Sequence, residues 1–171
     1  MKLDLGCGQN KKPDFTGVDK YEVPGVDQIV DLLQFPWPWA DESIEEVWCS
    51  HFFEHVPGPM RGQWMDELYR VLKPNARATI IVPYANSTRA TQDFTHAWPP
   101  VHEGSFQYFN RAWREVNALT HGPYDLKCDF EYSYGYDLFP YWQQRSQDAI
   151  QFALAHHLNA AADIQVFLTR R

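Results

Sequence analysis

The chain has 171 residues, enough for one domain with a single hydrophobic core, and no apolar run reaches the roughly 18 residues that cross a bilayer. Its formal net charge of -7 at pH 7 disfavours a nucleic-acid backbone or an anionic membrane as the main binding partner. The three cysteines form no Cys-x-x-Cys pair, which excludes that type of zinc or redox site, and with no secretory signal a cytoplasmic protein is expected.

Five short apolar runs in the first half of the chain end at Asp, Gly or Pro, as buried strands do. These predicted strands cover residues 2–5, 15–18, 27–30, 44–49 and 78–82. Between the last two, apolar residues at helical spacing predict an amphipathic helix over 60–72, which Lys73-Pro74-Asn75 ends. A strand, helix and strand in this order form a right-handed crossover between parallel strands, so the first half predicts an open α/β sheet.

The second half begins with a segment rich in aromatic residues, 84–145, which we expect to be an insertion with its own small core. Within it, a helix is predicted over 110–119 and a strand over 127–136. The tail then predicts a helix over 142–159 and a strand over 163–169. A closing strand of this kind is expected to complete the sheet.

Small and acidic residues stand where the first three predicted strands end. Gly6 and Gly8 follow the first strand, Asp19 ends the second, and Asp31 with Leu32 follows the third. Glycine lets the backbone turn sharply and approach a ligand, and carboxylates accept hydrogen bonds from ribose hydroxyls. Ligands of open parallel sheets bind at the carboxyl ends of the strands, so these residues predict a nucleoside pocket.

Phosphate-binding motifs are missing from this part of the chain. Lys11 occupies the third glycine position of the dinucleotide fingerprint, and no Gly-Lys-Ser or Gly-Lys-Thr occurs. A nucleoside without phosphates is therefore the favoured ligand.

The motifs in the first half of the chain resemble, in order, those of class I S-adenosylmethionine-dependent methyltransferases. They are "LDLGCG" at 3–8, "GVD" at 17–19, "DL" at 31–32 with "FPWPWADESIEEVWCSHFFEHV" at 35–56, and "ELYRVLKPNARATIIVP" at 67–83. They are most similar to a short, type 11-like bacterial and phage branch, in which the first helix is reduced to a turn and "SHxxEH" follows the fourth strand.

This resemblance implies an α/β fold with an open, mostly parallel Rossmann-like sheet, a shortened first helix and an aromatic-rich insertion after the fifth strand. It implies one methyltransferase domain over 1–171. Residues 1–83 would be the cofactor-binding half, 84–145 the substrate cap, and 146–171 a helix and strand that complete the sheet.

The resemblance also implies S-adenosyl-L-methionine as the cofactor and assigns residues to its parts. Asp19 would bind the ribose, and Asp31 and Leu32 the adenine. The residues implied at the methionine end and the sulfonium are Asp4, Gly6, Cys7, Gly8, Cys49, Ser50 and His51.

An alcohol, phenol or amine that accepts a methyl group must lose a proton, and a base with a pKa near 7 removes it best, which makes histidine the natural candidate. The catalytic candidates are His51 and His55, after the fourth predicted strand, and the pair Asp93 and His96. His55 also fits a turn residue bound to backbone, and Asp93 with His96 equally fits a structural clamp.

The same edge of the predicted sheet also carries a possible metal motif and residues that could contact a substrate. "HFFEH" at 51–55 matches a zinc-peptidase signature, but Val56-Pro57-Gly58-Pro59 leaves too short a helix for it, so no metal is expected. Substrate-contact candidates are Tyr84 and Arg89, just after the fifth strand, and Trp98 in the aromatic segment.

The sequence thus predicts an enzyme that transfers a methyl group in line to an oxygen or nitrogen nucleophile of a small molecule. Two alternatives stay open, a methyltransferase that modifies nucleic-acid bases or phage DNA and a non-catalytic partner subunit with the cofactor fold. The segment 49–56 lacks the Pro-Pro-Tyr type of motif found in amino-methylating DNA enzymes, which makes the first alternative weaker. A monomer or homodimer is expected.

Overall fold

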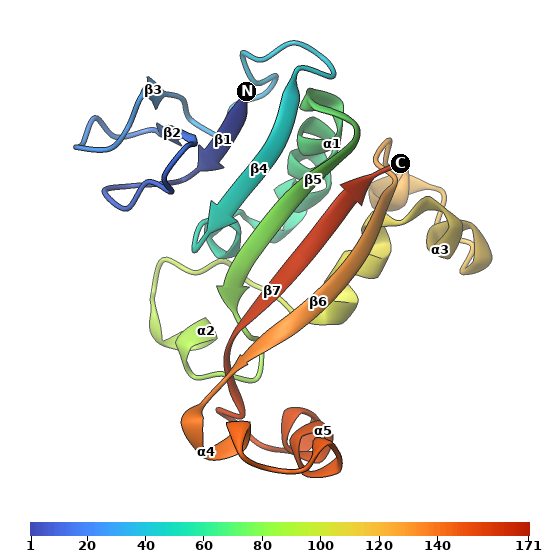
Figure 1. Cartoon of the computed structure of the whole chain (residues 1–171). Helices are drawn as coiled ribbons and strands as arrows, with labels where there is room; N and C mark the ends of the chain where they lie inside the picture. Colours follow the sequence, from blue (N-terminus) through green and yellow to red (C-terminus); the bar gives the residue numbers. More distant parts are fainter.

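Seven strands form one sheet in this computed structural model, which describes residues 1–171 (Figure 1). They are β1 (Lys2–Leu5), β2 (Thr16–Asp19), β3 (Gln28–Ile29), β4 (Ile44–Ser50), β5 (Leu72–Pro83), β6 (Phe130–Leu138) and β7 (Ala161–Arg170). The order is β3-β2-β1-β4-β5-β7-β6, and only β7 runs antiparallel to its neighbours. The open, mostly parallel α/β sheet expected from the sequence is confirmed.

The chain reverses its direction of travel across the sheet at β1. From β1 it moves outward to β2 and β3, and it then returns to the other side of β1 to form β4. The carboxyl ends of β1 and β4 therefore flank a topological switch point, where open α/β sheets bind their ligands.

The predicted helix over 60–72 is α1 (Arg61–Val71), and the predicted strand over 78–82 lies inside β5. The difference is at their junction, because β5 begins at Leu72 and includes residues 73–75, which therefore form no loop. Pro74 cannot continue a helix, and Leu72 pairs with Ile44 of β4, so the chain passes directly from α1 into the sheet.

The remaining helices are short. They are η1 (Phe53–His55), η2 (Gly58–Met60), α2 (Arg89–Gln92), η3 (Glu103–Phe109), α3 (Arg111–Val116), η4 (Gly122–Tyr124), α4 (Pro140–Gln143) and α5 (Gln147–His156). The helix predicted over 142–159 is thus two helices, because the Ser146 hydroxyl accepts from the Ala149 N–H at 3.3 Å and starts α5 anew. No helix combines the length and apolar character required to span a bilayer.

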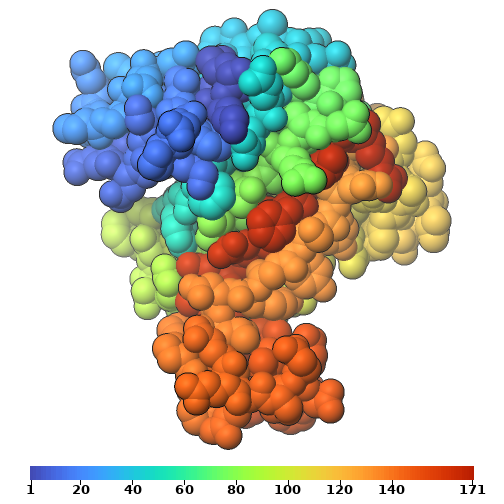
Figure 2. Space-filling model, viewed as in Figure 1, coloured from blue at the N-terminus to red at the C-terminus, as the bar shows by residue number.

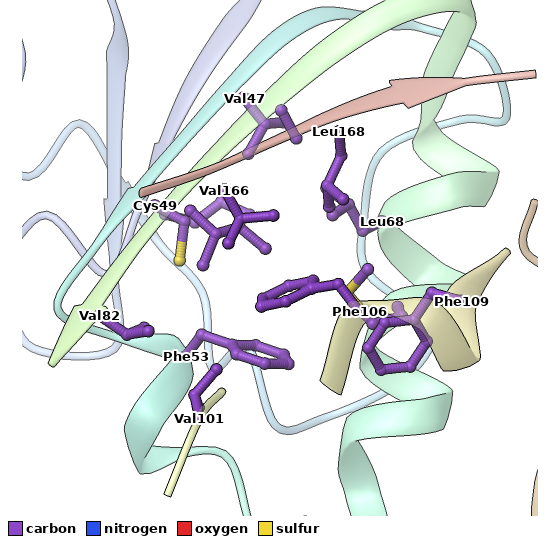
Figure 3. Close-up of a cluster of buried hydrophobic side chains, with 14 of the residues drawn as sticks. Val47, Cys49, Phe53, Leu68, Val82, Val101, Phe106, Phe109, Val166 and Leu168 are labelled. Atoms are coloured by element: carbon purple, nitrogen blue, oxygen red, sulfur yellow. The ribbon is translucent and has the colours of Figure 1, made fainter. Parts of the chain in front are cut away.

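Helices cover one face of the sheet. No helix connects β1 to β2, β2 to β3 or β3 to β4, and α1 lies behind the sheet in Figure 1. On this covered face, Val47 of β4 and Val166 of β7 belong to the same buried cluster as Phe53 and Phe106 (Figure 3). The opposite face carries no helix, and β5, β7 and β6 lie at the surface in Figure 2. Phe167 of β7 is 44% exposed.

The segment 84–145 does not form the separate small core expected from the sequence. Its buried residues Val101, Phe106, Phe109 and Phe130 belong to the same cluster of 34 residues as the sheet. The reason is the pairing of β6 with β7 along its whole length, which makes the predicted strand over 127–136 the last strand of the main sheet.

Candidate active site

A cavity of about 450 Å³ opens at the carboxyl ends of β1, β2 and β4, within the size range of small-molecule sites, roughly 300–1,000 Å³. Its walls come from the ends of these strands and from the segment that follows α2. The lining residues are Gly6, Asp19, Lys20, Tyr21, Val30, Asp31, Leu32, Leu33, His51, Phe52, His55 and Thr95. The cavity lies at the switch point of the sheet.

Two glycines form the turn after β1, and one of them, Gly6, lines the cavity. Gly6 has φ +71° and Gly8 has φ +50°, both in the left-handed region that favours glycine. A Cβ on Gly6 would overlap the ring of Phe52, whereas a Cβ on Gly8 would meet nothing within 4 Å. Gly6 thus allows Phe52 to close against the turn, and the Gly8 N–H donates to Asp19 Oδ2 at 3.0 Å.

Buried hydrogen bonds hold the link between β1 and β2 without a helix. Asp4 is 2% exposed, and its Oδ2 accepts from the Lys12 N–H at 2.7 Å. The N–H groups of Gly6 and Cys7 both donate to the carbonyl of Val18. Burial raises the pKa of the Asp4 carboxyl. Asp4 does not line the cavity, and its contribution is to hold the turn through the hydrogen bond from Lys12.

Two carboxylates line the cavity in fixed orientations. Asp19 Oδ1 accepts from the Tyr21 N–H at 3.0 Å, and Asp31 Oδ1 accepts from the Leu33 N–H at 3.0 Å. Each is a local side-chain-to-backbone turn of the kind that Asp favours. Leu32, which is 2% exposed, lies beside them. The cavity wall thus offers preorganised acceptors next to an apolar contact.

His51 lies between two buried carboxylates at the end of β4. Its Nδ1 is 3.4 Å from Glu54 Oε1, and its Nε2 is 3.6 Å from Asp163 Oδ2. The hydrogen bond to Glu54 is the main cause of a raised His51 pKa, and the charge on Asp163 adds to it. Burial raises the pKa of Asp163, whose Oδ1 has no hydrogen-bond partner, and Arg89 Nη1 lies 3.5 Å from its Oδ2.

The other catalytic candidates meet at a second corner of the cavity. His55 Nδ1 lies 3.2 Å from both the carbonyl oxygen and the Oγ1 of Thr95. Asp93 Oδ1 accepts from the Thr95 N–H at 2.9 Å and from its hydroxyl at 2.7 Å, and these bonds lower the pKa of Asp93. His96 Nε2 is 3.8 Å from Asp93 Oδ2. The structure therefore brings His55, Asp93 and His96 together, although only His55 lines the cavity.

A protein-family model described as a methyltransferase domain matches residues 19–80 of the chain. Together with the open sheet and the cavity at its switch point, this match identifies an S-adenosylmethionine-dependent methyltransferase domain in the chain. No curated protein matches its sequence significantly.

Solved structures of methyltransferases share the fold over almost the whole chain. An S-adenosylmethionine-dependent methyltransferase from Archaeoglobus fulgidus has a TM-score of 0.66 and 18% identity, covering 99% of this chain and 85% of that one. One from Mesorhizobium loti has a TM-score of 0.58 and 14% identity, with coverages of 99% and 90%. A provisionally assigned methyltransferase from Haloferax volcanii, in a complex with the Trm112 methyltransferase activator, has a TM-score of 0.57 and 12% identity, with coverages of 99% and 81%. At these identities the likeness concerns the fold.

The cavity of this methyltransferase suits S-adenosylmethionine. The cofactor carries no phosphate, and the turn after β1 offers no helix N-terminus to bind one. Its ribose hydroxyls and amino groups are hydrogen-bond donors, which match the carboxylates of Asp19 and Asp31. Its positively charged sulfur suits a site where the carboxylates of Glu54 and Asp163 approach His51.

Some predicted residues of the methyltransferase site lie away from the cavity. Tyr84 is 1% exposed, and its hydroxyl donates to the Leu154 carbonyl at 3.4 Å. Trp98 is 79% exposed and Cys49 is fully buried, and neither lines the cavity. Ser50 is the last residue of β4, next to His51, but it does not line the cavity. Cys7, in the turn after β1, does not line the cavity either.

Other residues of the methyltransferase site were missed from the sequence. Glu54 lies inside the "HFFEH" motif, and its position three residues after His51 could have indicated that the two side chains are in contact. Asp163 gave no signal, because its position depends on the antiparallel pairing that sets it opposite Pro83. Phe52 and Thr95 line the cavity but are of residue types that carry no chemical signal on their own.

Proposed function

We propose that this methyltransferase transfers the methyl group to an oxygen or nitrogen nucleophile of a small molecule, with His51 as the general base. The observation that supports this is the place of His51 in the cavity wall, between Glu54 and Asp163. Histidine is the side chain best suited to exchange a proton at physiological pH, and the contact with Glu54 raises the pKa of His51 above its ordinary value.

The proposed cofactor contacts follow the residues around the cavity. Asp19 binds the ribose hydroxyls, and Asp31 with Leu32 binds the adenine. At the methionine end we propose Gly6, Gly8, Ser50 and His51 as contacts, with Asp4 and Cys7 acting through the turn that they hold. The fixed orientation of the Asp19 and Asp31 carboxylates supports the first two roles.

The cofactor supplies a methyl group on a positively charged sulfur, which needs no acid to leave. The chain's own task is to align the acceptor and to remove its proton. With Glu54 Oε1 beside Nδ1, neutral His51 carries its proton on Nδ1 and accepts the acceptor's proton on Nε2. Asp163 then stabilises the imidazolium, and the half-exposed ring passes the proton to solvent.

The charges around the cavity support a small acceptor. The net charge of -7 opposes a phosphate backbone, and Arg89, with a side chain 42% exposed, is a cation available at Asp163. We propose Arg89 as a contact for a polar group of the acceptor. We also propose that the chain acts as a monomer or homodimer in the cytoplasm, which its three buried, unpaired cysteines support.

The test compares the wild-type chain with His51→Asn. His51 has φ +56°, a conformation that asparagine tolerates, so this variant removes the base without straining the backbone. Release of S-adenosylhomocysteine is followed with a panel of phenols, amines and alcohols, and separately with single-stranded DNA. We expect turnover of a small acceptor that falls about 10²–10⁴-fold in His51→Asn, a much larger loss than any change in the calorimetric affinity for S-adenosylhomocysteine.

Two results would overturn the proposal. Turnover restricted to DNA, with binding that falls steeply as salt rises, would favour base modification. An unchanged rate in His51→Asn would remove His51 as the base.

A further inference from the structure

Three potential metal ligands from two distant segments of the sequence meet beside the cavity. They are Glu54 and His55 of η1 and His96, which follows α2. One donor atom from each residue lies within 4.8 Å of the other two, close enough for a single ion to bridge all three.

Glu54 has a carboxylate oxygen that the protein leaves without a partner. The residue is 5% exposed, and its Oε2 is buried and makes no hydrogen bond. Its Oε1 lies near His51 Nδ1, so only one of the two oxygens is engaged. An unpaired buried carboxylate oxygen is costly, and a bound cation would satisfy it.

Both histidines are oriented as metal-binding histidines commonly are. His55 Nδ1 lies 3.2 Å from the Thr95 carbonyl, and His96 Nδ1 lies 3.1 Å from the Ala90 carbonyl. A carbonyl oxygen can only accept a hydrogen bond, so each neutral ring carries its hydrogen on Nδ1 and keeps a lone pair on Nε2. Hydrogen bonds of this kind fix the tautomer and the ring direction of metal ligands.

Buried contacts hold the two segments of the cluster in place. The Ala97 N–H donates to the Glu54 carbonyl at 2.8 Å. The Arg61 guanidinium, in a residue 8% exposed, donates to the carbonyls of Val56 at 3.1 Å, Pro99 at 2.6 Å and Ala97 at 3.2 Å. These bonds join η1 to the segment that carries His96, so the three ligands are preorganised.

We propose that Glu54, His55 and His96 form a binding site for a divalent transition-metal cation of the zinc class. Two imidazoles and one carboxylate suit Zn²⁺, Co²⁺, Mn²⁺ or Fe²⁺, and three protein ligands leave a coordination position open. The sequence argued against a metal because the helix after His51 is too short for the zinc-peptidase arrangement. In this cluster the second histidine ligand is His96, which lies in a separate segment of the chain, so the site does not need a long helix that carries both histidines.

The site adjoins the cofactor cavity, because His55 and Thr95 line its wall. An acceptor oxygen in the open coordination position would lose its proton more easily, since a divalent cation stabilises the oxyanion. This step rests on the proposed function, whereas metal binding itself does not.

The experiment measures metal content and affinity in the full chain, prepared without a polyhistidine tag and stripped with a chelator. Zn²⁺ binding is followed by competition with a chromophoric chelator, and Co²⁺ by its visible absorption spectrum. The variants are Glu54→Gln and His96→Ala, and the control is His121→Ala, an exposed histidine outside the cluster. Melting temperature and S-adenosylhomocysteine calorimetry are recorded for each preparation.

We expect one equivalent of Zn²⁺ in the wild type and the control, and an affinity lowered by more than about 100-fold in the two ligand variants. Absence of stoichiometric Zn²⁺ and Co²⁺ binding, or binding unchanged in folded His96→Ala, would overturn the site. If Glu54→Gln fails to fold, His96→Ala decides the result. Retained S-adenosylhomocysteine binding in a metal-free chain would separate failure of this site from failure of the proposed function.

Discussion

His51 Nε2 lies 3.6 Å from Oδ2 of Asp163, a residue that β7 brings to the carboxyl end of β4 from near the other end of the chain. Asp163 is 7% exposed, so its charge is poorly screened by solvent. The pair therefore couples the last strand of the chain to the proposed base.

Asp163→Asn tests this coupling. The substitution keeps the size of the side chain and removes the charge that would stabilise the His51 imidazolium. We expect kcat to fall by roughly ten-fold or more, about 1.4 kcal/mol or more of transition-state stabilisation, at unchanged affinity for S-adenosylhomocysteine, whose sulfur is uncharged. Steady-state kinetics and calorimetry with S-adenosylhomocysteine are the measurements. A kcat equal to that of the wild type would show that Asp163 is only structural.

Gly6→Ala and Gly8→Ala form a matched pair within one turn. Both residues have positive φ, which for alanine costs roughly 1–2 kcal/mol. Only at Gly6 would the added methyl group also overlap Phe52. We therefore expect Gly6→Ala to lower the free energy of unfolding by more than Gly8→Ala, and to weaken cofactor binding as Phe52 shifts.

Urea unfolding measures this difference, and the double variant Gly6→Ala with Phe52→Ala is its control. Removing the ring relieves the overlap, so the alanine at position 6 should then cost about the same as the alanine at position 8. If the two single variants are equally stable, the close approach of Phe52 to the turn is wrong.

The fold was most predictable where the signals were local. The strand over 2–5 and the turn at Gly6 and Gly8 depend on neighbouring residues and were predicted at the correct places. The separate core expected for 84–145 was wrong because the sequence does not show which strand β6 pairs with. The break before α5 had a local signal in Ser146, an N-cap residue, which the long apolar spacing concealed.

The residues of the candidate site were likewise predictable only where their place follows from a neighbouring strand. Asp19 and Asp31 could be placed because each follows a strand of a parallel sheet, and such strand ends meet at one edge. Asp163 and the contact of Glu54 with His96 depend on tertiary packing between distant segments, so periodicity and spacing could not reveal them.

Asp19→Ala tests the proposed ribose contact. The variant removes acceptors for the cofactor and for the N–H groups of Gly8 and Tyr21. We expect S-adenosylhomocysteine binding to weaken by about 1–3 kcal/mol, because hydrogen bonds to a charged group are lost. Calorimetry measures the change, with Asp125→Ala as a control at an exposed aspartate. Unchanged affinity in a folded Asp19→Ala protein would place the ribose elsewhere.

Glu67 provides a prediction for stability against pH, away from the active site. Its Oε2 accepts from the Trp37 N–H at 2.9 Å, and Arg70 donates to both carboxylate oxygens at 2.8 and 2.9 Å. The bonds from Arg70 are the main cause of a lowered Glu67 pKa. The side chain is 13% exposed, so these bonds are largely shielded from solvent.

A lowered folded-state pKa means that Glu67 stabilises the fold above its unfolded pKa, near 4.5, and that this contribution disappears as the pH falls through the lowered value. Glu67→Gln removes the charge, so we expect it to lower the free energy of unfolding by about 1–3 kcal/mol at pH 7. The gap between variant and wild type should narrow as the pH falls below 4.5. Urea unfolding at a series of pH values measures both, with Glu115→Gln at an exposed helix position as the control. A gap that stays constant with pH would mean that the Glu67 charge does not stabilise the connection between α1 and Trp37.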